Sequence, residues 1–115
     1  ADLHTAYTRA ANLSRTAPDE EPDPVYFVDP AEHRLYEKVC GLRPIVTGAV
    51  AERRYGEALE KLSTLREPVD AFFDAVLVMD ENRTLQKNRL ALLRAVVRLV
   101  HQVADLTKIP ALRKG

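Results

Sequence analysis

An apolar repeat of three and four residues runs through most of this chain and constrains its fold more than any other feature. Such spacing places side chains on one face of an α-helix. We expect helices at residues 3–15, 29–53, 55–65, 67–76 and 84–106. The one candidate strand, "AVLVM" at 75–79, is short and lies at a helix end. The sequence therefore predicts an all-α bundle of five to six helices with inward apolar faces.

Local residue chemistry marks several helix boundaries. Asp29 is expected to cap the second helix, because Pro30 follows it at the first helical position. Pro44 lies inside that helix and is expected to kink it or to divide it near residues 41–42. Asp80 or Asn82 is expected to cap the last helix.

Composition is typical of a soluble globular domain. The 115 residues suffice for a single domain, and 46% are apolar and 30% charged. No apolar run is long enough to span a membrane. The polar start at Ala1 does not resemble a signal peptide and favours a fragment of a longer chain. A single cysteine, Cys40, excludes an internal disulfide and fits a cytoplasmic protein in which this thiol is a small buried side chain.

Charge is unevenly distributed although the net charge is zero. Residues 16–37 hold seven acids and one base, whereas residues 79–115 hold eight Lys or Arg and three acids. We interpret residues 16–29 as a proline-rich acidic linker, expected to be mobile. The apolar patch "VYFV" at 25–28 could anchor this linker to the core.

The sequence contains no recognisable catalytic constellation. Its four glycines are scattered, which excludes a glycine-rich phosphate loop. His4, His33 and His101 lie far apart and lack the spacing of metal ligands. Asp70 and Asp74 lie one helical turn apart, and we interpret them as ion-pair partners and not as an acid–base pair. We therefore expect no catalytic residue, no metal site and no cofactor in this domain.

One arginine of the last helix falls inside its apolar face. At 100° per residue, Arg89 lies on the same arc as Leu85, Leu92 and Val96. A buried guanidinium must be paired, because an uncompensated charge costs several kcal/mol. We expect the partner to be Asp74 or Asp70 from the preceding helix, or else a group of backbone carbonyls. Arg89 would then be structural and would clamp the last two helices together.

The opposite face of the same helix carries Lys87, Arg94, Arg98 and His101. Two interpretations remain open for this stripe. It is either an ordinary solvated helix face or a surface that binds the phosphates of a nucleic acid. Tyr36 and Tyr55 could stack on unpaired bases, but both also lie at core spacing.

Two motifs in order resemble a known family. "LREPVDAFFDAVLVM" at 65–79 and "NRLALLRAVVRLVHQVADLTKI" at 88–109 are similar to the C-terminal anticodon-binding domain of bacterial glycyl-tRNA synthetase beta subunits. That domain is itself similar to the anticodon-binding domain of arginyl-tRNA synthetase. "AYTRAANLSR" at 6–15 and "PAEHRLYEKV" at 30–39 also resemble segments of the family. The likeness covers nearly the whole chain outside the acidic linker.

The resemblance implies a helical module that binds the anticodon arm of tRNA and performs no chemistry by itself. Its expected partners are tRNA, the remainder of the beta subunit and the alpha subunit, with no membrane and no DNA. ATP and Mg would be used by the whole ligase and not by this domain. The alternative is a helical domain for subunit assembly without direct contact to RNA. Steep salt dependence of binding would favour the first interpretation.

Overall fold

A computed structural model describes residues 3–17 and 20–107 of the chain. These residues form helices and no strand, which confirms the all-α prediction. In chain order they are α1 (Leu3–Leu13), the 3-10 turns η1 (Ser14–Thr16) and η2 (Pro24–Tyr26), then α2 (Pro30–Ala51), α3 (Tyr55–Ser63), α4 (Arg66–Ala75) and α5 (Arg83–Thr107).

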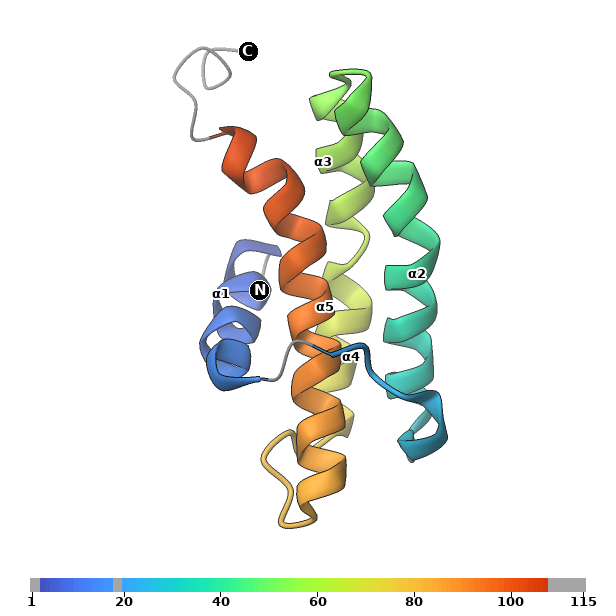
Figure 1. Ribbon diagram of the computed structural model, residues 1–115, viewed down its shortest axis with the longest axis vertical. Helices are drawn as coiled ribbons and strands as arrows, with labels where there is room; N and C mark the ends of the chain where they lie inside the picture. The colour runs from blue at the N-terminus through green and yellow to red at the C-terminus, as the bar shows by residue number, and fades with distance from the viewer. Residues whose placement is uncertain (1–2, 18–19, 108–115) are drawn as a thin grey trace.

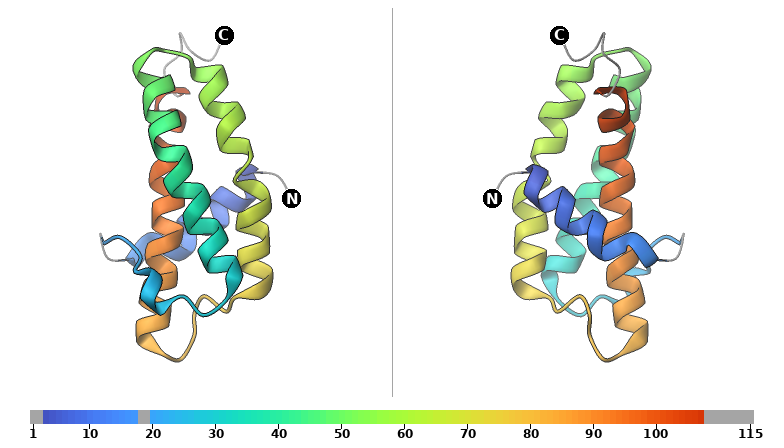
Figure 2. Two further views of the ribbon diagram at one scale, coloured as in Figure 1. Left: turned by 90° about the vertical axis from the view of Figure 1, so that its right-hand side faces the viewer. Right: turned by 90° about the vertical axis from the view of Figure 1, so that its left-hand side faces the viewer.

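Helix α5 runs through the middle of the bundle (Figure 1). Helix α2 packs along one side of it, and α3 and α4 stack nearly end to end as a second column. Helix α1 crosses α4 and α5 obliquely on the face away from α2 (Figure 2). The Arg9 guanidinium lies 4.0 Å from the centre of the Phe73 ring, which helps to attach α1 to α4.

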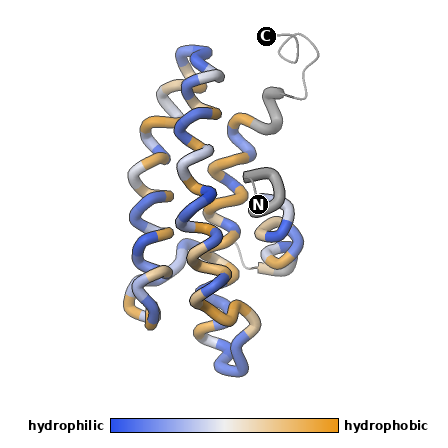
Figure 3. The backbone as a smooth tube through the Cα atoms, turned by 180° about the vertical axis from the view of Figure 1, so that it is seen from behind, coloured by the Kyte–Doolittle hydropathy of each residue, from blue (hydrophilic) through white to orange (hydrophobic). Residues whose placement is uncertain are grey.

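The apolar stripes of all five helices meet in one core. Figure 3 shows hydrophobic positions recurring along each helix between hydrophilic ones. The largest side chains with almost no exposed surface are Leu35, Leu62, Leu65, Phe72, Leu92, Leu93 and Leu99. Burial of this apolar surface is the main stabilising contribution, because each fully buried Leu or Phe contributes roughly 1.5–3 kcal/mol.

Both predicted helix caps are present. The Asp29 side chain accepts a hydrogen bond from the Ala31 amide, and Glu32 accepts one from the Asp29 amide, which completes a capping box. The side chain of Asn82 accepts hydrogen bonds from the amides of Thr84 and Leu85, so Asn82 caps α5. Capping therefore decides where these two helices begin.

Helix α2 continues through Pro44 as one α-helix, so the division near residues 41–42 is wrong, whereas the alternative of a kink at Pro44 stays a prediction. The proline removes one backbone donor, but its ring lies on the exposed side of the helix. Leu42 and Val46 on either side of it are buried in the core. Tertiary packing therefore keeps the helix whole where the local signal favours a break.

The expected anchor of the acidic linker is confirmed for one residue of the patch at 25–28. Phe27 packs against the core, with its ring 5.0 Å from His33 and 5.7 Å from Tyr36 between centres. Val25 and Val28 are 82% and 69% exposed. Residues 20–23 are attached to α5 and α2 by hydrogen bonds and ion pairs. We call these four residues the acidic strap. The mobility expected for the linker stays a prediction.

Candidate nucleic-acid interface

Helix α5 carries arginines in two different environments. Arg89 is buried, with 7% of its side chain exposed, whereas Arg98 points to solvent. The two lie nine residues apart, which is about half a turn around the helix axis. The helical repeat therefore assigned each arginine to the correct face.

Arg89 is the centre of a buried polar network at one end of the bundle. Its Nε lies 3.4 Å from Glu32 Oε2, and its Nη1 donates to the Leu77 carbonyl at 2.8 Å and lies 3.4 Å from Asp80 Oδ2. Glu32 is fully buried and also accepts from the Val28 and Asp29 amides. The network joins α5 to the start of α2 and to the loop after α4.

The predicted carboxylate partners of Arg89, Asp74 and Asp70, were wrong. The buried stripe of α4 consists of Pro68, Val69 and Phe72. At 100° per residue, Asp70 and Asp74 lie more than about 100° from the middle of that stripe. Asp70 Oδ2 is instead 4.0 Å from Arg66 Nε one turn earlier. Of the group of backbone carbonyls that was the alternative, one is present, since the Leu77 carbonyl accepts from Arg89.

Three of the four predicted RNA-binding residues line one hollow. Arg94, Arg98 and His101 border a space of about 290 Å³ together with Ser14 and Arg15 from η1. We call this space the basic groove. Arg15 is exposed and donates to Asn12 at 3.2 Å. It was not singled out from the sequence, because nothing local shows that the end of α1 returns to α5.

Lys87, the fourth predicted residue, lies apart from the other three. Its Nζ is 3.6 Å from Glu20 Oε2 of the acidic strap. It borders a different hollow of about 330 Å³, whose other lining residues include Glu20, Glu21 and Asp23. The strap therefore places carboxylates beside Lys87, while the basic groove is lined by cations and small or apolar residues.

The acidic strap is attached by specific contacts. The Asn88 side-chain amide accepts from the Asp23 amide at 2.6 Å and donates to the Asp23 carbonyl at 3.0 Å. Glu21 forms a two-point pair with Arg43 of α2, at 2.6 and 2.9 Å. The hydrogen bond to Glu21 raises the pKa of the Arg43 guanidinium. The opposite charges of residues 16–37 and 79–115 were a signal in the sequence that could have suggested the contact between Glu20 and Lys87.

The tyrosines considered for base stacking lie outside the basic groove. Tyr36 packs against Phe27, and burial raises the pKa of its hydroxyl. Tyr55 is half-buried at the start of α3. Another tyrosine, Tyr7, contacts a residue of the basic groove, since its ring centre lies 5.8 Å from that of His101. The side chain of His4 lies outside the described residues, and Cys40 is exposed, not buried as expected.

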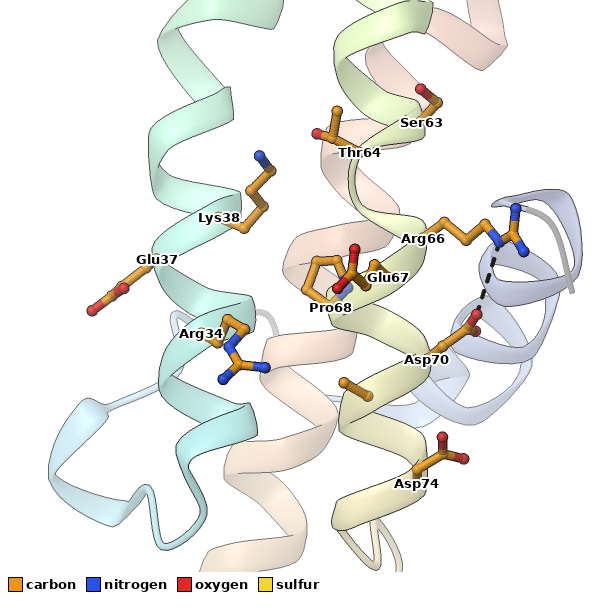
Figure 4. A pocket seen from close by; sticks show the side chains of 11 residues that line it. Arg34, Glu37, Lys38, Ser63, Thr64, Arg66, Glu67, Pro68, Asp70 and Asp74 are labelled. Atoms are coloured by element: carbon orange, nitrogen blue, oxygen red, sulfur yellow. Dashed lines mark ion pairs between the residues drawn. The ribbon is translucent and has the colours of Figure 1, made fainter.

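A third hollow lies between α2 and the α3–α4 column (Figure 4). Its volume is about 1040 Å³ and its lining carries both signs of charge, including Arg34, Lys38, Glu67 and Asp70. None of its lining residues comes from α1 or α5. It is therefore separate from the basic groove.

Residues 3–17 and 20–107 contain no group of His, Cys, Asp or Glu side chains arranged to hold a metal ion. Within the same part of the chain, no helix is both long and apolar enough to cross a membrane.

Comparison with known proteins places these features in a family. Residues 3–114 match the DALR anticodon binding domain. A glycine–tRNA ligase beta subunit of Desulforudis audaxviator is 50% identical over 108 residues, which cover 94% of this chain and 16% of the relative. The beta subunit of Aromatoleum aromaticum is 42% identical over 111 residues, covering 95% of this chain and 16% of the relative.

The matched region is therefore a small part of each of these relatives. That of Actinobacillus pleuropneumoniae is 46% identical over 87 residues, covering 76% of this chain and 13% of the relative. The family match, in contrast, spans nearly all of the 115 residues. The chain belongs to the DALR anticodon-binding domain family.

Proposed function

We propose that this chain binds the anticodon arm of tRNA as a module of a glycine–tRNA ligase beta subunit. The observation that carries the proposal is the basic groove, in which Arg15 from η1 joins Arg94, Arg98 and His101 from α5. Guanidinium groups bind phosphates with two parallel hydrogen bonds, and several of them on one surface can follow an RNA backbone. The family match and the names of the relatives support the same conclusion.

In this proposal the domain supplies binding and position, and the chemistry occurs elsewhere in the ligase. Holding one end of the tRNA fixes the orientation of the other end and lowers the entropy cost of reaching a distant active site. ATP, Mg, the alpha subunit and the rest of the beta subunit belong to the whole enzyme, which would act in the cytoplasm. The domain itself would have tRNA as its ligand.

The test uses the intact ligase with Arg94→Ala and Arg98→Ala combined. We expect weaker tRNA binding, and a log–log salt slope reduced in magnitude by roughly 0.7–0.9 for each lost phosphate contact. Formation of glycyl-adenylate should stay unchanged, because neither residue belongs to a chemical site. Affinity measured by titration at several salt concentrations, with adenylate formation alongside, gives both results.

A matched control removes two exposed cations from another part of the bundle. Arg53 lies in the turn between α2 and α3, and Lys61 lies on α3, and both are exposed. Arg53→Ala with Lys61→Ala should leave tRNA affinity and salt slope as in the unaltered ligase. An unchanged slope in the Arg94/Arg98 variant would refute the proposal. Loss of subunit association with an unchanged slope would favour the assembly interpretation instead.

A further inference from the structure

The acidic strap divides the row of cations on α5 into two parts. Figure 1 shows the segment before α2 passing over one face of α5. Lys87 lies seven residues before Arg94, which places it about 10 Å away along the helix axis and on nearly the same side. Carboxylates of the strap lie beside Lys87, whereas the described residues that line the basic groove include no carboxylate.

Packing and hydrogen bonds place the strap at this position. Pro22 is buried between exposed acidic neighbours. The buried Asn88 side chain accepts from the Asp23 amide and donates to the Asp23 carbonyl, so both polar groups of the backbone at this residue are bonded to α5. The position of the carboxylates therefore follows from specific contacts and not from their charge alone.

The strap occupies two cations that belong to different helices. Glu20 Oε2 lies 3.6 Å from Lys87 Nζ. Glu21 binds the Arg43 guanidinium through both carboxylate oxygens, at 2.6 and 2.9 Å. These four side chains are at least 36% exposed, so a phosphate of RNA could reach both cations if the carboxylates were absent. The strap therefore fills positions in which phosphates would otherwise bind.

We propose that the acidic strap ends the RNA-binding surface at Arg94 and makes the domain discriminate against RNA whose backbone continues past the basic groove. A continuous RNA duplex has to displace the strap or lie against its carboxylates, and both cost affinity. The anticodon arm closes in a loop, so its backbone turns and need not continue over Lys87. This inference rests on the proposed function, because it concerns the extent of the same surface.

Ionic screening confines the repulsion to one end of α5. The Debye length at physiological salt is about 8 Å. Lys87 and Arg94 are separated by more than this, at about 10 Å along the helix axis. RNA that lies only in the basic groove should be repelled weakly by Glu20 and Glu21, whereas RNA that lies over Lys87 should be repelled strongly. The strap should therefore lower affinity for a continuous duplex more than affinity for tRNA.

The test compares two RNAs on the intact ligase, namely glycine tRNA and a long RNA duplex of unrelated sequence. Glu20→Gln combined with Glu21→Gln, which we call the strap variant, removes both charges and keeps the bonds between Asn88 and Asp23. For each cation that gains a phosphate, duplex affinity should rise roughly fivefold at physiological salt, and the salt slope should steepen by roughly 0.7–0.9. Affinity for tRNA should rise less than about twofold.

Two further variants separate uncovered cations from a general change in charge. Lys87→Ala and Arg43→Ala, added to the strap variant, should cancel the gain in duplex affinity, because both cations that the strap covers are then absent. Glu60→Gln with Glu67→Gln serves as the matched control, because it removes two exposed acids from α3 and α4. The control should leave the affinity for both RNAs unchanged.

Three results would overturn the proposal. An equal gain for tRNA and duplex would mean that the strap weakens all RNA binding without discrimination. A gain that persists after Lys87→Ala and Arg43→Ala would mean that the strap does not cover these cations. Unchanged duplex affinity in the strap variant would refute this inference alone, provided that Arg94→Ala with Arg98→Ala still reduces the tRNA salt slope. An unchanged slope in that Arg94/Arg98 variant would instead refute the proposed function itself.

Discussion

Arg89 and Arg98 are the same residue type on one helix, yet their surroundings differ in almost every respect. Arg89 is enclosed by Glu32, Asp80 and the Leu77 carbonyl, where little water can screen its charge. Arg98 is exposed beside the basic groove. A buried charge must be paired for the protein to fold, whereas an exposed charge is screened and contributes little to stability. Burial therefore separates a structural arginine from one that is available for binding.

The largest expected effect is on the stability of the buried network. Arg89→Ala should lower the free energy of unfolding by about 2–5 kcal/mol, because Glu32 would remain buried without its cation. Arg98→Ala should change it by less than about 0.5 kcal/mol, as exposed substitutions usually do. Urea unfolding followed by circular dichroism measures both. Equal effects would contradict the distinction between the two arginines.

A double-mutant cycle identifies the carboxylate that pairs with Arg89. Arg89→Met and Glu32→Gln should show a coupling energy of about 1–3 kcal/mol, as residues in one network do. The same cycle with Asp74→Asn should give a coupling within about 0.5 kcal/mol of zero. A larger coupling to Asp74 than to Glu32 would restore the partner that the sequence suggested.

The attachment of the acidic strap should contribute less to the free energy of unfolding than the buried Arg89 network does. Asn88→Ala removes two hydrogen bonds to the backbone of Asp23 and should lower the free energy of unfolding by about 1–2 kcal/mol. Asn12→Ala serves as the control, because its hydrogen bond to Arg15 is exposed. The control should cost less than about 0.5 kcal/mol. An Asn88→Ala variant as stable as the control would show that the strap contributes nothing to folding.

The smallest expected effect concerns Lys87. Its ammonium already lies beside the Glu20 carboxylate. Because Lys87 would exchange this ion pair for a phosphate, its binding should release fewer counterions than the binding of an unpaired cation. Lys87→Ala should therefore change the salt slope for tRNA by less than the roughly 0.7–0.9 expected for Arg98→Ala. Glu20→Gln in the same assay should strengthen tRNA binding slightly. A change in salt slope for Lys87→Ala as large as that for Arg98→Ala would indicate that both side chains contact the bound RNA equally.

The sequence alone determined which elements form and which faces they bury. Apolar spacing of three and four residues predicted the α-helices, since no other regular structure gathers such side chains on one side. The Asp29–Pro30 start was equally local, because capping depends on a few adjacent groups. For the last helix the sequence left Asp80 and Asn82 open as caps, and the structure selects Asn82. The inward position of Arg89 and the outward position of Arg98 followed from the same repeat.

Only the tertiary structure decided which of these faces meet. Glu32 reaches Arg89 from 57 residues away in sequence, and Asp23 reaches Asn88 from 65. Helical periodicity gives the angle of a side chain around its own axis and carries no information about the neighbouring helix. For that reason the sequence correctly indicated that Arg89 needs an anion but selected Asp74 and Asp70. The same limit hid the acidic strap beside Lys87 and the return of Arg15 to Arg94 and Arg98, since long-range packing fixed all three.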